Sequence, residues 1–259
     1  LEKTISKETL FNLYSVEQFT LKEICEMFNT NNKAINKLLE VYEIPPRKNQ
    51  GLKPIQRTSI SERQLQIIRG TLLGDGFLSF PAKRSTNAVL EVTHSEKQEE
   101  YLNWKVSELN PFITKVDKYT VKGRFIVDHQ TKDSKAVRLR TVSHPNLNNL
   151  VTEYYPNGKK IFSLEILNKI NELGLAVWYM DDGHTYYGSR LEIALGECGE
   201  STAKLICDWF NSKWDIVSGF RYTRGGFRCY FNVANSKKLV AIINPHFVPS
   251  MRYKIQKLI

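Results

Sequence analysis

The sequence predicts a mixed α/β (α+β) protein in which one unit of helices and strands occurs twice, after a small all-α module. Two apolar segments, IIRGTLLGDG at 67–76 and LAVWYMDDG at 175–183, both end in Asp-Gly. Their aspartates, Asp75 and Asp182, hold the same place in the two segments. A similar order of helices and strands follows each segment. We interpret this as duplication of one subdomain, which brings equivalent positions together across a pseudo-twofold axis.

The composition favours a packed globular protein that binds a polyanion. Hydrophobic residues make up 41% of the 259 residues, and the formal net charge is +10. Basic residues are spread along the chain and interleaved with aromatic residues, which favours nucleic acid over a membrane surface. No apolar run reaches the length of a membrane span, and no secretion signal is visible. We therefore expect double-stranded DNA, and no membrane, as the partner.

The cysteines indicate a reducing compartment. Cys25, Cys198, Cys207 and Cys229 are scattered and form no CxxC pair. Neither a zinc site nor a disulfide framework is indicated. We expect a soluble intracellular protein of the cytoplasm, the nucleoid or an organelle matrix.

Residues 1–46 carry the pattern of three short helices. Apolar residues repeat twice with helical spacing across 21–42, and Thr20 with Glu23 forms a capping-box pair that predicts a helix start. The asparagines of 28–31 supply the break, since asparagine tolerates left-handed geometry. An earlier apolar run predicts a helix that packs on the other two.

This module is predicted to be a helix-turn-helix, with the polar face of its last helix in the major groove. The prediction depends on the basic chain and on the ability of asparagine to pair with adenine. A plain helical hairpin with a solvated polar face is the alternative. The predicted DNA-facing residues are Asn32, Lys33, Asn36 and Lys37.

Residues 47–58 are predicted to be a basic linker. The stretch PPRKNQGLKPIQR at 45–57 holds three prolines and a glycine, so no helix is expected to run through it. A basic linker can follow a phosphate backbone, and Arg47 and Lys48 are its predicted DNA-binding residues. An ordinary solvated linker is the alternative.

The first copy of the repeated unit is predicted to span 59–160. Ser61 and Gln64 form a capping-box pair that opens a helix running through Gly74. Alternation and composition predict strands, and helical periodicity predicts a further helix. The predicted strands are 77–80, 88–94, 119–128 and 136–142, and the further helix is 95–109.

The second copy, over 161–259, repeats this order. A hairpin is predicted around Gly225-Gly226. The predicted helices are 163–171, 172–182, 201–213 and 237–244, and the predicted strands are 190–195 and the two arms of the hairpin at 220–233.

Asp75 and Asp182 stand where a helix would be more stable with a lysine. The helix dipole disfavours carboxylates at a C-terminus, and the glycine that follows ends the helix. Gly70 and Gly74 leave a flat strip on one helix, to which Ala176 of the other helix can add, so the two backbones can approach closely. The carboxylates then converge and need a cation, and hard oxygen ligands favour Mg²⁺. Beside a phosphate, such an ion can activate water and stabilise the leaving oxygen.

The two segments resemble the paired motifs of the LAGLIDADG homing endonucleases, in their monomeric, two-motif form. The resemblance covers roughly 58–259, and the repeat order agrees as well as the motifs. It implies a pseudo-twofold duplicated αββαββα fold whose two antiparallel four-stranded sheets form a saddle over the DNA major groove. It also implies a monomer that cuts both strands of a long DNA site with Mg²⁺, for which Mn²⁺ can substitute.

The motif positions carry over residue by residue. Gly70 falls on the first glycine of the motif, while Val177 replaces that glycine in the second copy. Leu73 and Met180 replace the inner aspartate, a departure that leaves the acidic catalytic position intact. The metal-binding residues that the resemblance implies are Asp75, Asp182, Gly74 and Asp181.

Members of this family also place a basic residue near each active centre. Lys160 in NGKKIFS matches the first of these positions, with Lys159 as a rival. Lys254 in the tail segment PSMRYKI matches the second. A surface lysine is the alternative in each case.

DNA reading is expected from the strands, because alternation puts one face on the core and the other on DNA. Arginine suits the O6 and N7 atoms of guanine, although contact with phosphate is at least as frequent. The predicted residues are Asn87, Lys122, Arg124, Arg138, Arg140, Arg190, Arg221, Arg224, Arg228 and Tyr230.

Two other functions fit the same fold. The first is a catalytically inactive DNA-binding regulator, against which the retention of Asp75, Asp182 and both lysines argues. The second is an intron maturase that binds RNA, which no residue excludes. An intron-encoded or free-standing origin is expected over an intein, because no splicing-type Cys or Ser lies near Leu1 and no His-Asn pair ends the chain.

Overall fold

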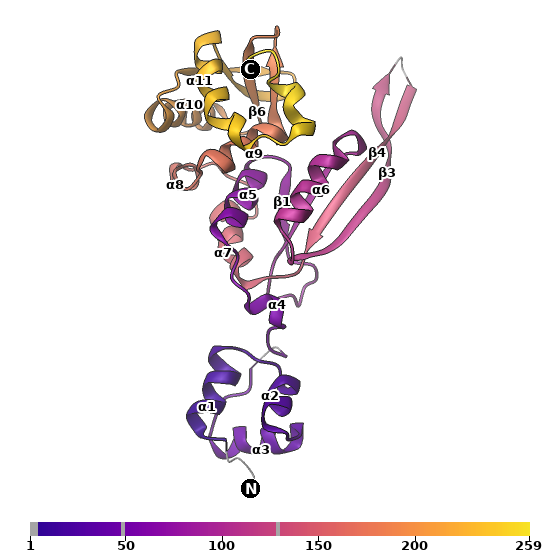
Figure 1. The fold of residues 1–259 in the computed structure, drawn as a ribbon, viewed down its shortest axis with the longest axis vertical. Helices are drawn as coiled ribbons and strands as arrows, with labels where there is room; N and C mark the ends of the chain where they lie inside the picture. Colours follow the sequence, from indigo (N-terminus) through magenta and orange to yellow (C-terminus); the bar gives the residue numbers. More distant parts are fainter. Residues whose placement is uncertain (1–4, 48–49, 128–129) are drawn as a thin grey trace. The chain divides into compact units, whose positions relative to one another are not determined.

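The computed structural model describes residues 5–47, 50–127 and 130–259, apart from some strand side chains. The chain divides into two units, Leu1–Ser59 and Ile60–Ile259 (Figure 1). The first unit is helical and has its own small apolar core. Its elements are α1 (Lys7–Phe11), the π-helix η1 (Asn12–Val16), α2 (Leu21–Phe28), α3 (Asn32–Val41) and α4 (Pro54–Arg57).

The start of α2 follows from local side-chain chemistry. The Thr20 hydroxyl accepts a hydrogen bond from the Glu23 amide, and the Glu23 carboxylate accepts one from the Thr20 amide. This is the predicted capping box. Asn29 then ends the helix with a left-handed φ of 49°, and Asn31 caps α3 by accepting from the Ala34 amide. The two helices are therefore joined by a tight turn.

The segment predicted to be a linker packs on this helical unit. Arg57 forms an ion pair with Glu23 at 2.5 Å and lies 3.8 Å from the centroid of the Phe19 ring. The Arg57 hydrogen bond lowers the pKa of Glu23 to about 2. The four-residue helix α4 occupies only the end of the proline-rich stretch, and it begins at Pro54, whose missing N–H leaves no helical bond unmade in the first turn.

The second unit consists of two αββαββα halves, as predicted. Each half holds one four-stranded antiparallel sheet, with strand orders β1-β2-β4-β3 and β5-β6-β8-β7. The first half contains α5 (Glu62–Leu73), β1 (Gly76–Ser79), β2 (Val89–Ser95), the 3₁₀ helix η2 (Glu96–Gln98), α6 (Glu99–Glu108), β3 (Ile113–Val127), β4 (Gln130–Thr141) and α7 (Pro145–Tyr154).

The second half follows a short helix, α8 (Leu164–Asn168), and ends in two 3₁₀ helices. The four tryptophans of the chain all lie in the second unit, and Trp178 and Trp209 are fully buried in a core that spans both halves. The elements are α9 (Glu172–Asp182), β5 (Gly183–Tyr186), β6 (Arg190–Gly196), α10 (Glu200–Trp214), β7 (Ser218–Thr223), β8 (Gly226–Phe231), α11 (Val233–Ile243), η3 (Asn244–His246) and η4 (Pro249–Lys254).

Some elements differ from the sequence prediction. The asparagine-rich helix α7 and the four-residue strand β5 were not predicted from residue pattern, because asparagine is a poor helix former and a short strand shows little alternation. Helix α11 begins at Val233 instead of 237, because the Asn232 side chain accepts from the Asn235 amide and caps it.

The two halves meet where α5 packs along α9. A Cβ atom on Gly70 would lie 2.3 Å from the Gly174 carbonyl oxygen and 2.8 Å from the Val177 Cβ. Only glycine allows this approach of the two backbones. The nearest partners are therefore Gly174 and Val177 and not Ala176, which was the predicted neighbour. Gly74 likewise makes room for the Asp181 side chain, which a Cβ there would meet at 2.4 Å.

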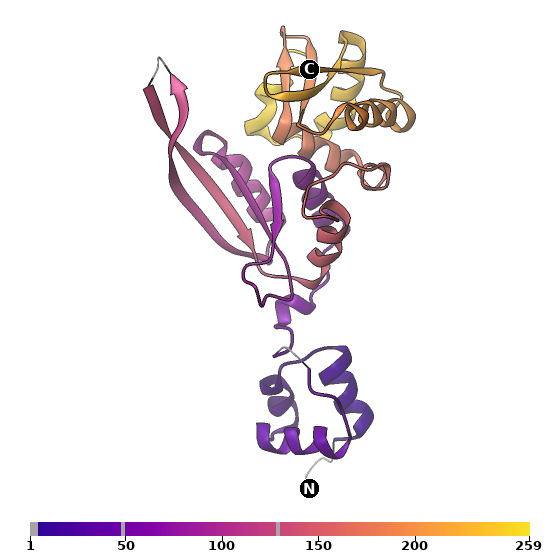
Figure 2. The ribbon, with the colours of Figure 1, turned by 180° about the vertical axis from the view of Figure 1, so that it is seen from behind.

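The two sheets differ in the length of their hairpin strands. The β3–β4 hairpin has strands of 15 and 12 residues, whereas β7 and β8 have six each. The long hairpin extends well beyond the rest of its sheet (Figure 2). Among the residues that the structure describes, no helix is both long and apolar enough to cross a membrane.

Candidate active site

The two motif aspartates lie at neighbouring helix ends. Asp75 follows Gly74, the C-cap of α5, and Asp182 is the last residue of α9. Each is followed by a glycine that begins the first strand of its sheet. A hydrogen bond joins the two ends, because the Asp75 amide donates to Asp181 Oδ2 at 3.3 Å. The packing of α5 on α9 therefore brings the aspartates to one site, as the sequence predicted.

The two carboxylates differ in proton affinity. Burial raises the pKa of Asp182 to about 7, helped by the negative charges of Asp75 and Asp181 and opposed by Lys160 and Lys254. Burial also acts to raise the pKa of Asp75, but its contact with His94 and nearby positive charges lower it overall. Two close carboxylates in a partly desolvated site repel each other, so the site favours binding of a cation.

The two predicted lysines occupy equivalent places. Lys160 Nζ donates to the carbonyl oxygens of Leu73 and Gly74 at 3.0 and 2.8 Å. Lys254 Nζ donates to those of Met180 and Asp181 at 2.6 and 3.0 Å. Each lysine thus satisfies the carbonyl end of one motif helix, where positive charge is favourable. Burial lowers the pKa of both lysines, while the site aspartates act in the opposite direction.

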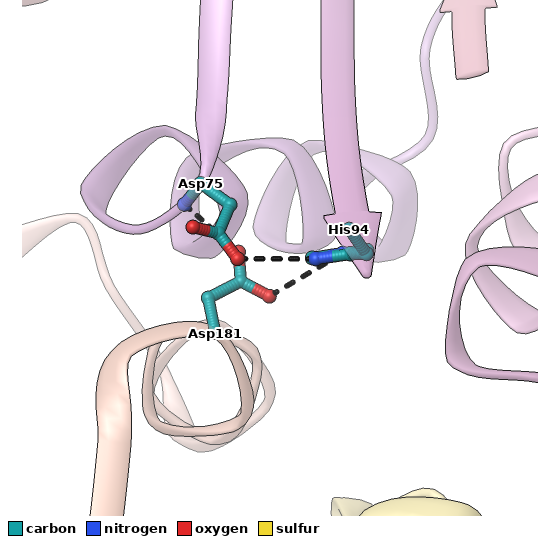
Figure 3. Close-up of side chains that lie close together, drawn as sticks. All are labelled: Asp75, His94 and Asp181. Atoms are coloured by element: carbon teal, nitrogen blue, oxygen red, sulfur yellow. Dashed lines mark hydrogen bonds and ion pairs between the residues drawn. The ribbon is translucent and has the colours of Figure 1, made fainter. Parts of the chain in front are cut away.

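The Asp181 side chain belongs to a buried cluster that the sequence did not reveal. Lys105 Nζ lies 2.8 Å from Asp181 Oδ1, and the Tyr101 hydroxyl donates to the same oxygen at 2.8 Å. The side chains of Lys105, Asp181 and His94 are fully buried. His94 Nδ1 lies 3.0 Å from Asp75 Oδ2, and His94 Nε2 lies 3.9 Å from Asp181 Oδ1 (Figure 3).

One signal could have identified His94 as a site residue. In AVLEVTH the apolar positions alternate, and His94 stands two residues after the buried Val92, where an apolar residue is expected. A buried histidine at the end of such a run needs polar partners. Lys105 gave a similar signal, because it follows Tyr101 by one helical turn on the buried face of α6.

The chemical type of the available ligand atoms indicates which residues suit a metal ion. The Asp75 and Asp182 carboxylates offer hard oxygen atoms, which suit Mg²⁺. Ligand atoms of Asp75, His94 and Asp181 also lie within 4.8 Å of one another. Lys105 and Tyr101 already use the Asp181 carboxylate, however, and a set with imidazole nitrogen suits transition metals better. We therefore favour Asp75 and Asp182 as the metal ligands, with Gly74 and Asp181 offering only backbone carbonyls.

A cavity opens beside Asp182. It has a volume of about 680 Å³ and is lined by residues of both halves, among them Gly74, Lys160, Asp182, Leu195 and Cys198. Asp182 lines this cavity, whereas Asp75 is not among its lining residues.

The predicted DNA-facing arginines lie on the sheets, and several are paired with acids. Arg140 lies 2.7 Å from Glu91, and Arg221 lies 2.5 Å from Glu192. Glu91 and Glu192 occupy equivalent places, because Glu91 pairs with Phe77 of β1 and Glu192 with His184 of β5. Such pairing fixes the direction of a guanidinium group.

Three other residues that were predicted to contact DNA have partners within the protein. Arg138 pairs with Glu91 and Asp117, and Arg228 contacts the ring of His184. Arg47 donates to the carbonyl oxygens of Tyr14 and Phe19, so it holds the first unit together, which leaves it poorly placed for DNA.

Asn87 is only 9% exposed and accepts a hydrogen bond from Asn148. Lys48 and the side chain of Arg124 lie outside the described residues. The exposed predicted residues are Asn32, Lys33, Asn36, Lys37, Lys122, Arg190, Arg224 and Tyr230.

Two αββαββα halves that pack their first helices together, with a motif carboxylate at each helix end, define the fold of the homing endonucleases. The structure of the homing endonuclease I-WcaI bound to its DNA recognition sequence has this fold, with a TM-score of 0.69 and 22% sequence identity. It matches 81% of this chain and 95% of that chain. Residues 65–239 match the model of the LAGLIDADG DNA endonuclease family, and the chain belongs to that family.

The chain is also similar in sequence to curated proteins that are not named as endonucleases. Protein RecA of Mycolicibacterium flavescens is 32% identical over 211 residues, which are 76% of this chain and 47% of that protein. The chain thus spans about half the length of this relative. Cytochrome b mRNA maturase bI2 of Debaryomyces hansenii is 25% identical over 202 residues, 76% of this chain and 74% of that protein. No motif predicted the likeness to a protein named RecA.

Proposed function

We propose that this chain is a site-specific endonuclease that makes a metal-dependent double-strand break in a long DNA target. The observation that carries the proposal is the convergence of Asp75 and Asp182 at adjacent helix ends, each beside a lysine that binds the carbonyl oxygens of a motif helix. Two near-equivalent centres suit the cutting of two strands. A regulator that only bound DNA would gain nothing from a partly desolvated site whose carboxylates repel each other.

Asp75 and Asp182 would hold Mg²⁺, with Mn²⁺ as a substitute. A bound divalent ion lowers the pKa of its water and stabilises a departing oxygen in an in-line displacement. The chain supplies the rest of the chemistry. Lys160 and Lys254 place positive charge next to the carboxylates, and the partial burial of the site strengthens these interactions.

The two sheets would bind the DNA duplex. Their exposed faces carry the arginines that Glu91 and Glu192 orient, and these side chains can contact guanine edges or phosphates. The net charge of +10 supports binding to the phosphate backbone.

Cleavage of a randomised duplex library, with Mg²⁺ and with EDTA, tests the proposal. We expect discrete double-strand ends that sequencing maps to one site, and no ends in EDTA. Specific binding of a selected duplex without cutting in Mg²⁺ or Mn²⁺ would contradict the proposal and support a regulator. Retention of structured RNA, with no duplex bound, would support a maturase, which the likeness to maturase bI2 makes the second candidate.

We further propose that the first unit binds DNA through the exposed polar face of α3. Removing residues 1–59 should shorten the protected footprint on one side and weaken binding roughly 10²-fold, because a second tethered contact is lost. Cleavage chemistry should survive, since the site lies in residues 60–259. Footprinting and mobility-shift titration measure these effects. As a control, alanine at Asn32, Lys33, Asn36 and Lys37 in the full chain should shorten the footprint equally; an unchanged footprint in both proteins would refute a DNA-binding role.

A further inference from the structure

The two halves of the second unit are not chemically equivalent at the aspartates. Strand register identifies the matching positions, because Gly76 pairs with Val92 in the first sheet and Gly183 pairs with Ile193 in the second. Two residues further along each inner strand stand His94 and Leu195. Both side chains face the core, at 3% and 6% exposure. The first half therefore has an imidazole where the second has an alkyl group.

His94 is held in place from several sides. Its ring lies 5.0 Å from the ring of Tyr101, between centroids. Its Nδ1 meets Asp75 at 3.0 Å, and its Nε2 faces Asp181 at 3.9 Å. Lys105 and Tyr101 fix Asp181 in turn. The Asp75 carboxylate, whose side chain is 38% exposed, is thus anchored on its inner side by a fully buried group.

The Asp182 carboxylate has a different neighbourhood. Leu195 has no polar atom in its side chain, and it lines the cavity of about 680 Å³ together with Asp182 and Thr202. Asp75 instead has the buried His94 as its neighbour on the inner side. Leu195 therefore offers Asp182 no counterpart of the contact between His94 and Asp75, although Asp182 is less exposed than Asp75.

We infer that His94 is a positioning residue for Asp75 and that the two DNA strands are cut by unequal centres, of which only the Asp75 centre depends on His94. This inference rests on the proposed endonuclease function. His94 would act by holding the Asp75 carboxylate in one orientation, in which it could bind a metal ion. Partners of this kind, which orient a metal ligand, typically contribute 10–100-fold to activity.

Strand-resolved cleavage tests the inference. The substrate is a duplex of the mapped site with a different end label on each strand, and the first variant is His94→Leu, which copies the residue of the second half. We expect cleavage of one strand to slow roughly 10–100-fold, with the other strand little changed, so that nicked DNA accumulates. His94→Gln keeps a hydrogen-bond donor and should restore part of the rate. The part-exposed His246 at η3 provides a matched control, His246→Leu, which should cut both strands as the wild type does.

A second measurement needs neither metal nor DNA. The four tryptophans lie within residues 60–259, so their fluorescence in EDTA reports denaturant unfolding of that unit. A double-mutant cycle compares Asp75→Asn in the wild type and in His94→Leu. If His94 contacts Asp75 directly, the shift of the unfolding midpoint caused by Asp75→Asn should differ between the two backgrounds.

The outcomes separate the inference from the proposed function. A wild-type protein that cuts neither strand would refute the endonuclease. A wild-type protein that cuts both strands, combined with equal slowing of both in His94→Leu, would refute the unequal centres. Additive midpoint shifts would refute the direct coupling of His94 to Asp75.

Discussion

Replacing Asp182 with asparagine is expected to abolish cleavage and, at the same time, to stabilise the metal-free protein at pH 8. Loss of a metal ligand removes several kcal/mol of transition-state stabilisation, and about 4 kcal/mol corresponds to a rate loss of about 10³-fold. The stability gain arises because the ionised Asp182 is held close to Asp75 and Asp181 in a partly desolvated site.

The pH dependence of this gain has a definite sign. The folded-state pKa of Asp182 is about 7, above the ordinary value of 3.8, so the proton binds more tightly to the folded chain. The contribution of Asp182 to stability is then full below pH 4 and is lost as the pH rises to 7. Asparagine avoids this loss, so the variant should gain about 2–4 kcal/mol above pH 7 and progressively less toward pH 4.

Denaturant unfolding in EDTA between pH 4 and 8, followed by tryptophan fluorescence, measures the gain. The exposed Asp208 of α10, which pairs with Lys204, gives a matched control, Asp208→Asn, whose stability should change little. A variant that is less stable than the wild type at pH 8, or one that still cuts both strands, would contradict the role assigned to Asp182.

Valine at Gly70 should unfold or separate the two halves. The added Cβ would lie 2.3 Å from the Gly174 carbonyl, and backbone atoms cannot move aside as a flexible side chain can. Overpacking typically costs 1–3 kcal/mol, so a clash with backbone should cost about 3 kcal/mol or more, and alanine at Gly70 somewhat less. Cleavage should fall with it, because the α5–α9 contact brings Asp75 and Asp182 together.

Thermal and denaturant unfolding measure this effect. Gly225 provides the control, since a Cβ there meets nothing within 4 Å and Gly225→Val should leave the unfolding midpoint nearly unchanged. A Gly70→Val protein as stable as the wild type would show that the two helices do not pack as described.

The frame of the second unit could be predicted because its signals are local and duplicated. Ser61 with Gln64 marked the start of α5, and Gly76 and Gly183 marked where the motif helices give way to strands. The same order of helices and strands was predicted in both halves, so the pattern in one half supported the elements assigned in the other. The pairing of α5 with α9 was also predictable. Glycine destabilises the middle of a helix, so Gly70 indicates a place where another backbone packs closely.

The interior of the site could not be predicted because its partners are distant in sequence. Asp181 lies next to Asp182 and is predicted from the sequence to bind the metal, yet its carboxylate contacts Lys105 of α6. Nothing in the residues around Lys105 indicates that partner. The arginines on the sheets present the same difficulty, since Arg221 reaches Glu192 through the pairing of β6, β8 and β7.

The unequal hairpins bear on the symmetry of the target. A homodimer of identical halves reads a palindrome, because the DNA must repeat the twofold axis of the protein. Two halves within one chain need not be identical, and here β3 and β4 have 15 and 12 residues whereas β7 and β8 have six each. As an endonuclease of the kind proposed, this chain would recognise a non-palindromic site, with more base pairs read on the side of the longer hairpin.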